Sequence, residues 1–288
     1  MLVHIEHLQK CYHKKNVLDI ESLDIEKGKI YGFVGENGAG KTTLFRLITG
    51  LSIPTAGILE RDFDLQKMGI MIENPIMELG MTATENMEWM KRVFHSFDCE
   101  NIQELLKLVK LDQAGKKSVK QFSLGMKQRL GIAMSLMTKP EIIMLDEPMN
   151  GLDPEGMVDF RTVLQEINRR GVTILISSHL LEELYKLATD FVFIKNGKVV
   201  HTTSQQEMEG KVTSVFCMKT SDDQRATECL EQKFSTKVKA GHSEMEFRFP
   251  KEKILTLSKQ LADEGIYIAE LYEKGFDIEK YYMEIMTK

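Results

Sequence analysis

A glycine-rich stretch near the start of the chain constrains its fold more than any other feature. It fits the pattern G-x-x-x-x-G-K-[ST] at every position and runs Gly35-Glu36-Asn37-Gly38-Ala39-Gly40-Lys41-Thr42-Thr43. An apolar run over residues 30–34 precedes it, and a helical pattern over residues 44–48 follows it. A phosphate-binding loop requires this order of strand, loop and helix. The sequence therefore predicts an α/β core of the P-loop NTPase type.

The charge of a nucleoside triphosphate explains the residue types in this loop. Gly38 and Gly40 allow backbone N–H groups to form an anion-binding nest. A helix that begins near Lys41 adds the positive end of its dipole. We expect Lys41 to reach the β- and γ-phosphates and the Thr42 hydroxyl to bind Mg²⁺. The expected nucleotide-binding residues of the loop are Gly35, Asn37, Gly38, Ala39, Gly40, Lys41, Thr42 and Thr43.

A second chemical feature is the pair of carboxylates that ends the apolar run Ile142-Ile143-Met144-Leu145. A strand buried on both faces would place Asp146 and Glu147 at its carboxyl end, where parallel sheets bind ligands. We expect Asp146 to hold Mg²⁺ through water and Glu147 to polarise the water that attacks the γ-phosphate. The alternative interpretation is a strand that ends in a solvated acidic turn.

Two further side chains are candidates for the same site. His179 follows the apolar strand pattern over residues 172–176, and a histidine at that strand end could bind the γ-phosphate and the water-polarising group. Tyr12 lies in a polar turn between two alternating patterns, over residues 3–8 and 17–25. Its ring could stack on a base, or it could be an amphipathic surface residue, and spacing alone does not distinguish these.

Composition limits the classes of function. The 288 residues include 38 Lys and Arg and 43 Asp and Glu, so there is no basic excess and no nucleic-acid partner is expected. Four cysteines lack C-x-x-C spacing, which is typical of a reducing cytosol. The start lacks a signal-peptide pattern, and no apolar stretch approaches about 18 residues. A role at a membrane would therefore require a partner.

The pattern along the chain predicts three parts. An N-terminal β section precedes the phosphate loop, and a block with helical spacing, including a helix over residues 128–138, interrupts the α/β core over about residues 76–136. Residues 1–204 form the predicted nucleotide-binding domain, and residues 205–288 form a small accessory α+β domain in which no site is evident. The methionines near residues 126–149 fit gap-filling core positions or, less directly, an adaptable interface.

These motifs together resemble the nucleotide-binding subunit of an ATP-binding-cassette (ABC) transporter. The segment Phe122-Ser123-Leu124-Gly125-Met126-Lys127-Gln128-Arg129 resembles the family signature, and Asn150-Gly151-Leu152-Asp153 resembles the D-loop. His179 is similar to the switch histidine, and Tyr12 takes the adenine-stacking position. The resemblance covers about residues 2–203.

The resemblance implies an ATP-hydrolysing enzyme that binds ATP and Mg²⁺ and works as a homodimer. Two subunits would enclose two ATP molecules head to tail, with Ser123 and Gly125 of one chain at the γ-phosphate held by Lys41 of the other. Asp153 is carried over as a further nucleotide-binding residue. The helical subdomain would transmit the closure of the dimer to an integral membrane permease. This implies that the chain lies in the cytoplasm, at the inner face of the membrane.

Three positions depart from the family pattern. Leu124 and Met126 replace a glycine and the glutamine of the signature, and Glu73 occupies the Q-loop glutamine position. A carboxylate at residue 73 should bind Mg²⁺ more strongly but repel negative charge that develops at the γ-phosphate. We therefore predict that Glu73→Gln changes the ATPase rate and its Mg²⁺ response; unchanged values would refute this.

Three features resemble the subfamily for export of, or immunity to, peptide antibiotics such as bacitracin and lantibiotics. They are Glu73, the signature, and a C-terminal extension that carries Tyr281-Tyr282-Met283-Glu284-Ile285. The implied cargo is an antimicrobial or toxin peptide. The alternatives are a soluble ABC ATPase that acts on ribosomes or DNA and a regulatory subunit that senses peptide without moving it. Ribosome-acting members usually carry two cassettes and DNA-repair members a long coiled coil, neither of which this sequence contains. All these classes would share the same catalytic core.

Overall fold

The computed structural model describes residues 1–13, 15–72, 76–94, 98–211, 215–240, 244–274 and 277–287. The chain forms two compact units. The first contains Met1–Gln205 and the C-terminal segment Tyr282–Lys288, and the second contains Gln206–Tyr281. The end of the chain therefore belongs with the first unit, although the sequence grouped it with the accessory domain.

The centre of the first unit is a six-stranded sheet in the order β5-β6-β7-β3-β8-β9. All neighbours are parallel except the hairpin of β8 and β9. The strands are β3 (Ile30–Val34), β5 (Met68–Met71), β6 (Ile142–Asp146), β7 (Thr173–Ser177), β8 (Asp190–Lys195) and β9 (Lys198–Ser204). Every residue of β3, β6 and β7 is buried, as expected for central parallel strands. Their carboxyl ends therefore meet at one sheet edge.

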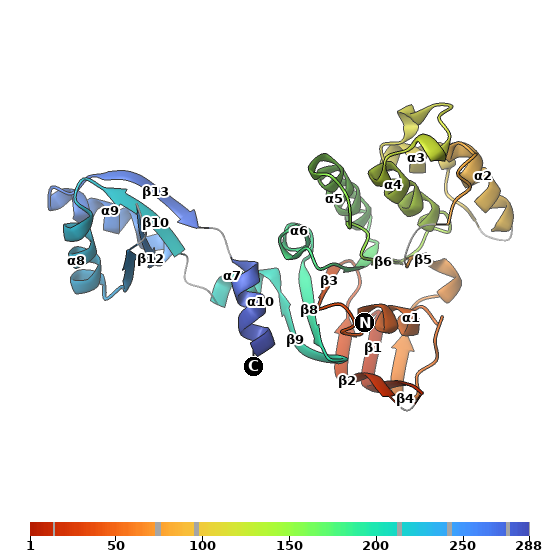
Figure 1. The fold of residues 1–288 in the computed structure, drawn as a ribbon, viewed down its shortest axis with the longest axis horizontal. Helices are drawn as coiled ribbons and strands as arrows, with labels where there is room; N and C mark the ends of the chain where they lie inside the picture. Colours follow the sequence, from red (N-terminus) through yellow and green to blue (C-terminus); the bar gives the residue numbers. More distant parts are fainter. Residues whose placement is uncertain are drawn as a thin grey trace. The chain divides into compact units, whose positions relative to one another are not determined.

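A second sheet of three antiparallel strands, in the order β2-β1-β4, covers helix α1 (Lys41–Ile48). Its strands are β1 (Val3–Tyr12), β2 (Lys15–Ile25) and β4 (Ala56–Arg61) (Figure 1). One apolar core joins the inner face of this sheet, α1 and the central sheet, with Ile5, Phe33 and Phe45 fully buried. This packing holds the start of α1 in place after β3.

Strand β4 was not predicted, because its sequence, AGILER, does not alternate apolar and polar residues, and four of its six residues are exposed. Only its pairing with β1 defines it. Gly57 adopts φ 91°, and a Cβ atom there would lie 2.1 Å from the His7 carbonyl oxygen. The close approach of β1 therefore requires glycine at this position.

The helical block contains α2 (Ala83–Val93), α3 (Ile102–Leu108) and α4 (Leu124–Ser135). Thr82 and Glu85 form a capping box at the start of α2. The predicted start of the third helix at Gln128 was wrong, because α4 begins at Leu124. Ser123 is its N-cap and its side chain accepts a hydrogen bond from the Met126 N–H. Further helices α5 (Pro154–Arg169) and α6 (Leu181–Tyr185) follow β6 and β7.

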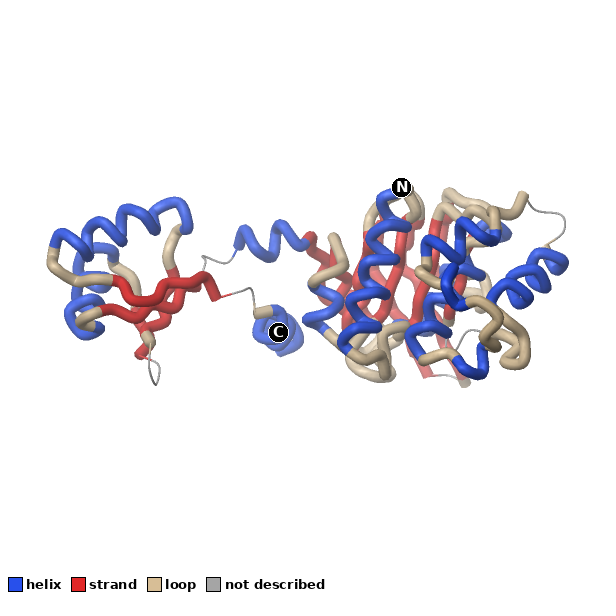
Figure 2. The backbone as a smooth tube through the Cα atoms, turned by 90° about the horizontal axis from the view of Figure 1, so that it is seen from above, coloured by secondary structure: helices blue, strands red, loops and turns tan. Residues whose placement is uncertain are grey.

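The second unit has its own sheet, with the order β11-β12-β10-β13 and antiparallel neighbours throughout. Its elements in chain order are β10 (Val215–Thr220), α8 (Asp223–Phe234), β11 (Val238–Ala240), β12 (Met245–Arg248), α9 (Ile254–Asp263) and β13 (Ile268–Lys274). Helices α7 (Gln205–Lys211) and α10 (Ile278–Thr287) each contain residues of both units. Figure 2 draws the helices in blue and the strands in red. Phe216, Phe247 and Leu257 belong to the separate core of the second unit. This unit is α+β.

Candidate functional site

The glycine-rich loop connects the end of β3 to the start of α1. Gly38 has φ 83° and Gly40 has φ 109°, conformations that L side chains rarely adopt. Gly40 is the N-cap of α1, and no side chain caps that helix. The first N–H groups of α1 are therefore left for another acceptor, as an anion site requires.

The buried side chain of Lys41 lies inside this loop. Its Nζ donates to the Gly35 carbonyl at 2.6 Å and to the Glu36 carbonyl at 3.3 Å. It also lies 3.5 Å from Glu147 Oε1, which is an ion-pair distance. The ammonium is thus held at the mouth of the loop, where an anionic ligand would meet it.

Two neighbouring segments brace the loop by close backbone contact. The Gly197 N–H, in the turn between β8 and β9, donates to the Ala39 carbonyl at 2.9 Å. A Cβ atom on Gly35 would lie 2.4 Å from the Ile194 carbonyl oxygen, and one on Gly40 would lie 2.9 Å from a methyl of Leu18. Larger residues at these positions would displace the loop from β8 or β2.

Asp146 ends β6 beside the loop and is buried. Its Oδ2 accepts a hydrogen bond from the Thr42 hydroxyl at 2.6 Å, and its Oδ1 accepts one from the Ser177 hydroxyl at 2.5 Å. Hydroxyl and carboxylate oxygens are ligands that Mg²⁺ prefers, and Mg²⁺ is usually bound through one or two carboxylates plus substrate phosphates. The oxygen pair of Thr42 and Asp146 fits that ion.

Glu147 lies between the lysine and the histidine. Its φ of 49° is left-handed, which is uncommon for a residue other than glycine. Its Oε2 accepts from the His179 N–H at 3.2 Å and lies 2.9 Å from His179 Nδ1. Its Oε1 faces Lys41. The structure therefore brings together the predicted residues Lys41, Thr42, Asp146, Glu147 and His179.

The Tyr12 ring ends β1 and is 41% exposed. Its hydroxyl is 3.4 Å from the Ser52 hydroxyl, and Lys10 Nζ lies 4.8 Å from the ring centroid. Of the remaining loop residues, Asn37 is exposed and Thr43 is half-buried.

The signature residues form a separate group with the D-loop. Ser123 caps α4, and Asp153 caps α5 by accepting from the Gly156 N–H at 2.9 Å. A Cβ atom on Gly125 would lie 3.7 Å from Gly156 Cα, so the starts of α4 and α5 are adjacent. In the described part of the chain, no hydrogen bond or ion pair connects Ser123, Gly125 or Asp153 to Lys41.

One predicted site residue lies outside the described structure, and one residue at the site was not predicted. Glu73 lies outside the described residues, so its predicted place at the metal remains a sequence-based expectation. Ser177 was not predicted as a site residue, although the sequence shows serine at this strand end. Only the register of β6 with β7, which pairs Asp146 with Ser177, reveals its position.

Comparison with known proteins identifies the family. A model described as ABC transporter matches residues 18–150. An ABC transporter ATP-binding protein of Bacillus subtilis, YcbN, is 37% identical over 99% of this chain and 97% of its own length. The chain belongs to the ABC transporter ATP-binding proteins. This ABC ATPase binds and hydrolyses ATP.

Other relatives have names that mention a cargo. The bacitracin transport ATP-binding protein BcrA of Bacillus licheniformis is 32% identical over 95% of this chain and 90% of its own length. The lantibiotic transport ATP-binding protein SrtF of Streptococcus pyogenes is 42% identical over 69% of this chain and 89% of its own length.

Solved structures confirm the predicted fold class. An ATP-binding subunit of an ABC transporter has a TM-score of 0.62 at 25% identity, covering 73% of this chain and 93% of its own. A dimeric ATP-binding cassette bound to ADP and Pi has a TM-score of 0.61 at 23% identity, covering 71% and 99%. In the described residues, we find no helix of sufficient length and apolarity to cross a membrane.

Proposed function

We propose that this ABC ATPase powers a membrane exporter of antimicrobial or toxin peptides, in export or in self-immunity. The proposal of a peptide cargo rests on the similarity to transport proteins named for two kinds of peptide antibiotic, bacitracin and lantibiotics. The bacitracin relative aligns with 95% of the chain, so the similarity includes most of the accessory unit.

Glu147 is the proposed general base of ATP hydrolysis. Its carboxylate would accept a proton from water as the water oxygen attacks the γ-phosphorus and the bond to the β-phosphate oxygen breaks. His179 is proposed to orient Glu147 and to hydrogen-bond the γ-phosphate. The support is the 2.9 Å approach of His179 Nδ1 to Glu147 Oε2. Lys41 would balance the phosphate charge.

Mg²⁺ is proposed as the metal, held by Thr42 and by Asp146. When bound, it would neutralise phosphate charge. The support is the 2.6 Å distance between the Thr42 hydroxyl at the start of α1 and Asp146 Oδ2 at the end of β6. Glu73 is kept as a proposed third metal contact on the basis of sequence alone. Tyr12 is the proposed adenine-stacking residue, since its ring is aromatic and partly exposed.

A head-to-tail homodimer is proposed to complete the site. The signature group has no contact with Lys41 within the described chain, so a second copy would have to supply Ser123, Gly125 and Asp153. The test uses Glu147→Gln as background. ATP should produce a dimer that Gly125→Asp abolishes, because a negative charge would face the γ-phosphate.

The control for this test is Gly80→Asp. A Cβ atom at Gly80 has no neighbour within 4 Å, and one at Gly125 has only ordinary contacts, so both variants should fold. Loss of the dimer in both variants, or in neither, would contradict the proposed arrangement.

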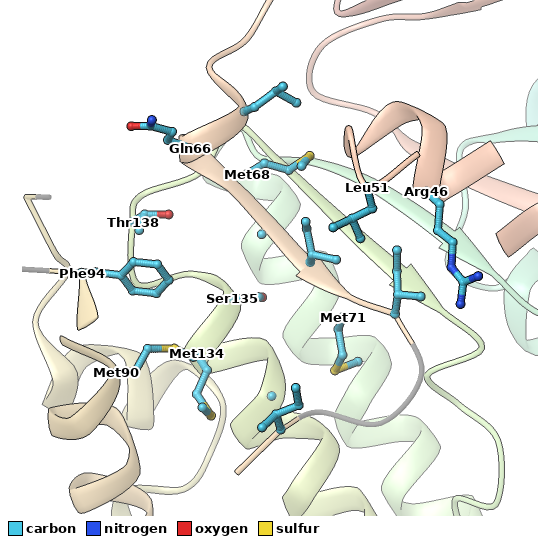
Figure 3. A pocket seen from close by; sticks show the side chains of 16 residues that line it. Arg46, Leu51, Gln66, Met68, Met71, Met90, Phe94, Met134, Ser135 and Thr138 are labelled. Carbon is cyan, nitrogen blue, oxygen red and sulfur yellow. The ribbon is translucent and has the colours of Figure 1, made fainter. Parts of the chain in front are cut away.

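A groove between β5 and the helical block is the proposed docking site for a short apolar helix of the permease. It has a volume of about 690 Å³. Figure 3 shows Met68 and Met71 of β5 lining it together with Met90, Phe94 and Met134 of the helical block. Flexible methionines suit an adaptable apolar contact.

The groove also has exposed apolar side chains at its margin. Leu51 is 65% exposed and Ile76 is 88% exposed. Exposed apolar surface of this kind is typical of protein contacts. Binding to a permease here would place the chain at the cytoplasmic face of the membrane.

The deciding experiment is a pull-down of the tagged chain from detergent-solubilised membranes of its host. We expect a stoichiometric membrane partner, and Ile76→Glu should reduce its recovery at least tenfold while ATPase activity of the isolated chain is retained. Leu255→Glu is the matched control, since Leu255 is 80% exposed and lies outside the groove. Recovery only with ribosomes or DNA, or with no membrane partner, would contradict the transport proposal. Binding of the permease without peptide transport would favour a sensing role.

A further inference from the structure

Ser177 is a buried serine at the last position of β7. Its exposed fraction is 0%, although a serine hydroxyl usually reaches water. Strand register places it directly beside Asp146 in the neighbouring strand β6. It lies two residues before His179 and has none of the functional roles proposed above for the site residues.

The Ser177 hydroxyl contacts both acidic residues at once. It donates its one proton to Asp146 Oδ1 at 2.5 Å and accepts a hydrogen bond from the Glu147 backbone N–H at 2.9 Å. Because Oδ1 is engaged by Ser177, the other oxygen of Asp146 faces Thr42 at the start of α1. The hydroxyl of Ser177 thus holds the Asp146 carboxylate in a rotation that directs one of its oxygens toward the phosphate loop.

The same hydroxyl also holds an unusual backbone conformation. Glu147 has φ 49°, and this left-handed turn directs its side chain between Lys41 and His179. Such strained backbone conformations are maintained only where several surrounding contacts hold them in place. The bond from the Glu147 N–H to Ser177 is one such constraint, since it ties the turn to the end of β7.

We propose that Ser177 is the positioning residue that sets the orientation of both Asp146 and Glu147 for metal-dependent ATP hydrolysis. The proposal rests on the roles proposed above for these two acids. Ser177 acts through them and does not itself touch the nucleotide. Its loss should therefore affect metal-assisted binding and turnover more than the binding of ATP alone.

The test compares Ser177→Ala with the conservative variant Ser177→Thr, which keeps the hydroxyl. Affinity for a fluorescent ATP analogue is measured with Mg²⁺ and again with a chelator, and turnover is measured separately. Loss of a hydrogen bond to a charged group predicts that Ser177→Ala weakens binding with Mg²⁺ about tenfold and lowers kcat about tenfold. Binding in chelator should change less than about twofold, and Ser177→Thr should restore most of the metal effect.

Ser178→Ala is the matched control. Ser178 is also 0% exposed, and its hydroxyl accepts a hydrogen bond from the nearby Leu180 N–H at 3.0 Å. We expect it to keep the wild-type ratio of affinities with and without Mg²⁺. If Ser177→Ala does not fold, Ser177→Cys replaces it, because a thiol is a weaker donor of similar size and should give a smaller loss in the same direction.

The variant Asp146→Asn distinguishes a failure of the positioning role of Ser177 from a failure of the metal role of Asp146. Mg²⁺ is expected to raise the affinity for the ATP analogue above that measured in chelator. If Asp146→Asn loses this effect of Mg²⁺ while the Ser177 variants keep it, the positioning proposal is wrong and the proposed metal role of Asp146 is retained. If Asp146→Asn also keeps the effect, the proposed metal role is wrong. A Ser177→Ala protein with a lower melting temperature but an unchanged Mg²⁺ ratio and kcat would show that Ser177 is merely structural.

Discussion

His179 Nδ1 lies 2.9 Å from Glu147 Oε2, while the other oxygen of that carboxylate lies 3.5 Å from Lys41 Nζ. The three residues come from the ends of β7 and β6 and from the start of α1. One carboxylate is thus shared between the phosphate-binding lysine and the histidine. Entry of a triphosphate would supply a new partner for Lys41 and leave Glu147 with His179. This arrangement leads to the first two predictions.

Glu147→Gln should bind ATP but hydrolyse it about 10²- to 10⁴-fold more slowly, because the amide cannot accept the proton of the attacking water. The ATP-bound dimer should then accumulate, which light scattering after size-exclusion chromatography would detect. Glu141→Gln is a suitable control, since Glu141 is a half-exposed carboxylate paired with Lys27. Wild-type turnover in Glu147→Gln would disprove the general-base role.

Lys41→Ala should lose measurable ATP binding, because the loop would lose its buried ammonium at the mouth of the anion site. Titration with a fluorescent ATP analogue measures this directly. Lys27→Ala removes a half-exposed lysine that pairs with Asp62 and Glu141, and it should retain binding. Retained affinity in Lys41→Ala would show that the triphosphate binds elsewhere.

Asp159 of α5 pairs with Arg129 of α4 and, at 2.7 Å, with Lys110 after α3. Asp159→Asn should lower the free energy of unfolding by about 1–3 kcal/mol, since the mostly buried Arg129 would lose its counter-charge. Urea unfolding at pH 7 measures this. Asp98→Asn is the control, because Asp98 is 88% exposed and its pairing with Lys139 should contribute little.

The ion pairs of Asp159 also predict how the stability of the protein depends on pH. The hydrogen bond from Lys110, and then the charge of Arg129, lower the pKa of Asp159 below its ordinary value of 3.8. A lowered folded-state pKa gives stability that is present above the unfolded value and lost as the pH falls through the folded one. The stability difference between wild type and Asp159→Asn should therefore be constant above about pH 5 and shrink below pH 3.8. A difference that instead grows on acidification would contradict this sign.

The C-terminal segment should contribute to nucleotide binding. The Tyr282 ring lies 6.4 Å from that of Phe193 in β8, and Lys195 donates to the Met286 carbonyl. Strand β8 also supplies the Ile194 carbonyl that packs against Gly35. Tyr282→Ala should lower the free energy of unfolding by about 1 kcal/mol and weaken ATP binding a few-fold.

Thermal unfolding and ATP titration test the Tyr282 prediction. Met283→Ala is the control, because the neighbouring Met283 side chain is 58% exposed. Equal effects of the two variants would remove the argument for a specific contact with β8.

Local patterns were sufficient for the elements whose cause is local. The loop 35–43, the strand before Asp146 and the α/β fold class were predicted because glycine spacing and apolar runs act over a few neighbouring residues. The start of α4 was missed although its signal is also local, since Ser123 is a good N-cap. The prediction placed the start of this helix at Gln128, whereas the helix begins directly after Ser123.

Other features depended on partners distant in the chain. Strand β4 has a mostly exposed surface and exists through pairing with β1, and the end of the chain belongs with β8 through contacts of Tyr282 and Met286. Such contacts join residues separated by about 50 or more positions, and no periodicity records them.

At the site, the sequence predicts which chemical groups are present, but the fold decides how they are arranged. The types of group present, a lysine, a threonine, two carboxylates and a histidine, follow from residues that stand next to recognisable strands and turns. Their mutual arrangement does not, because parallel register decides that Ser177 lies beside Asp146, and a left-handed turn decides that Glu147 faces Lys41 and His179. Register and turn geometry are consequences of packing the whole sheet, so only the folded chain defines which of these groups meet.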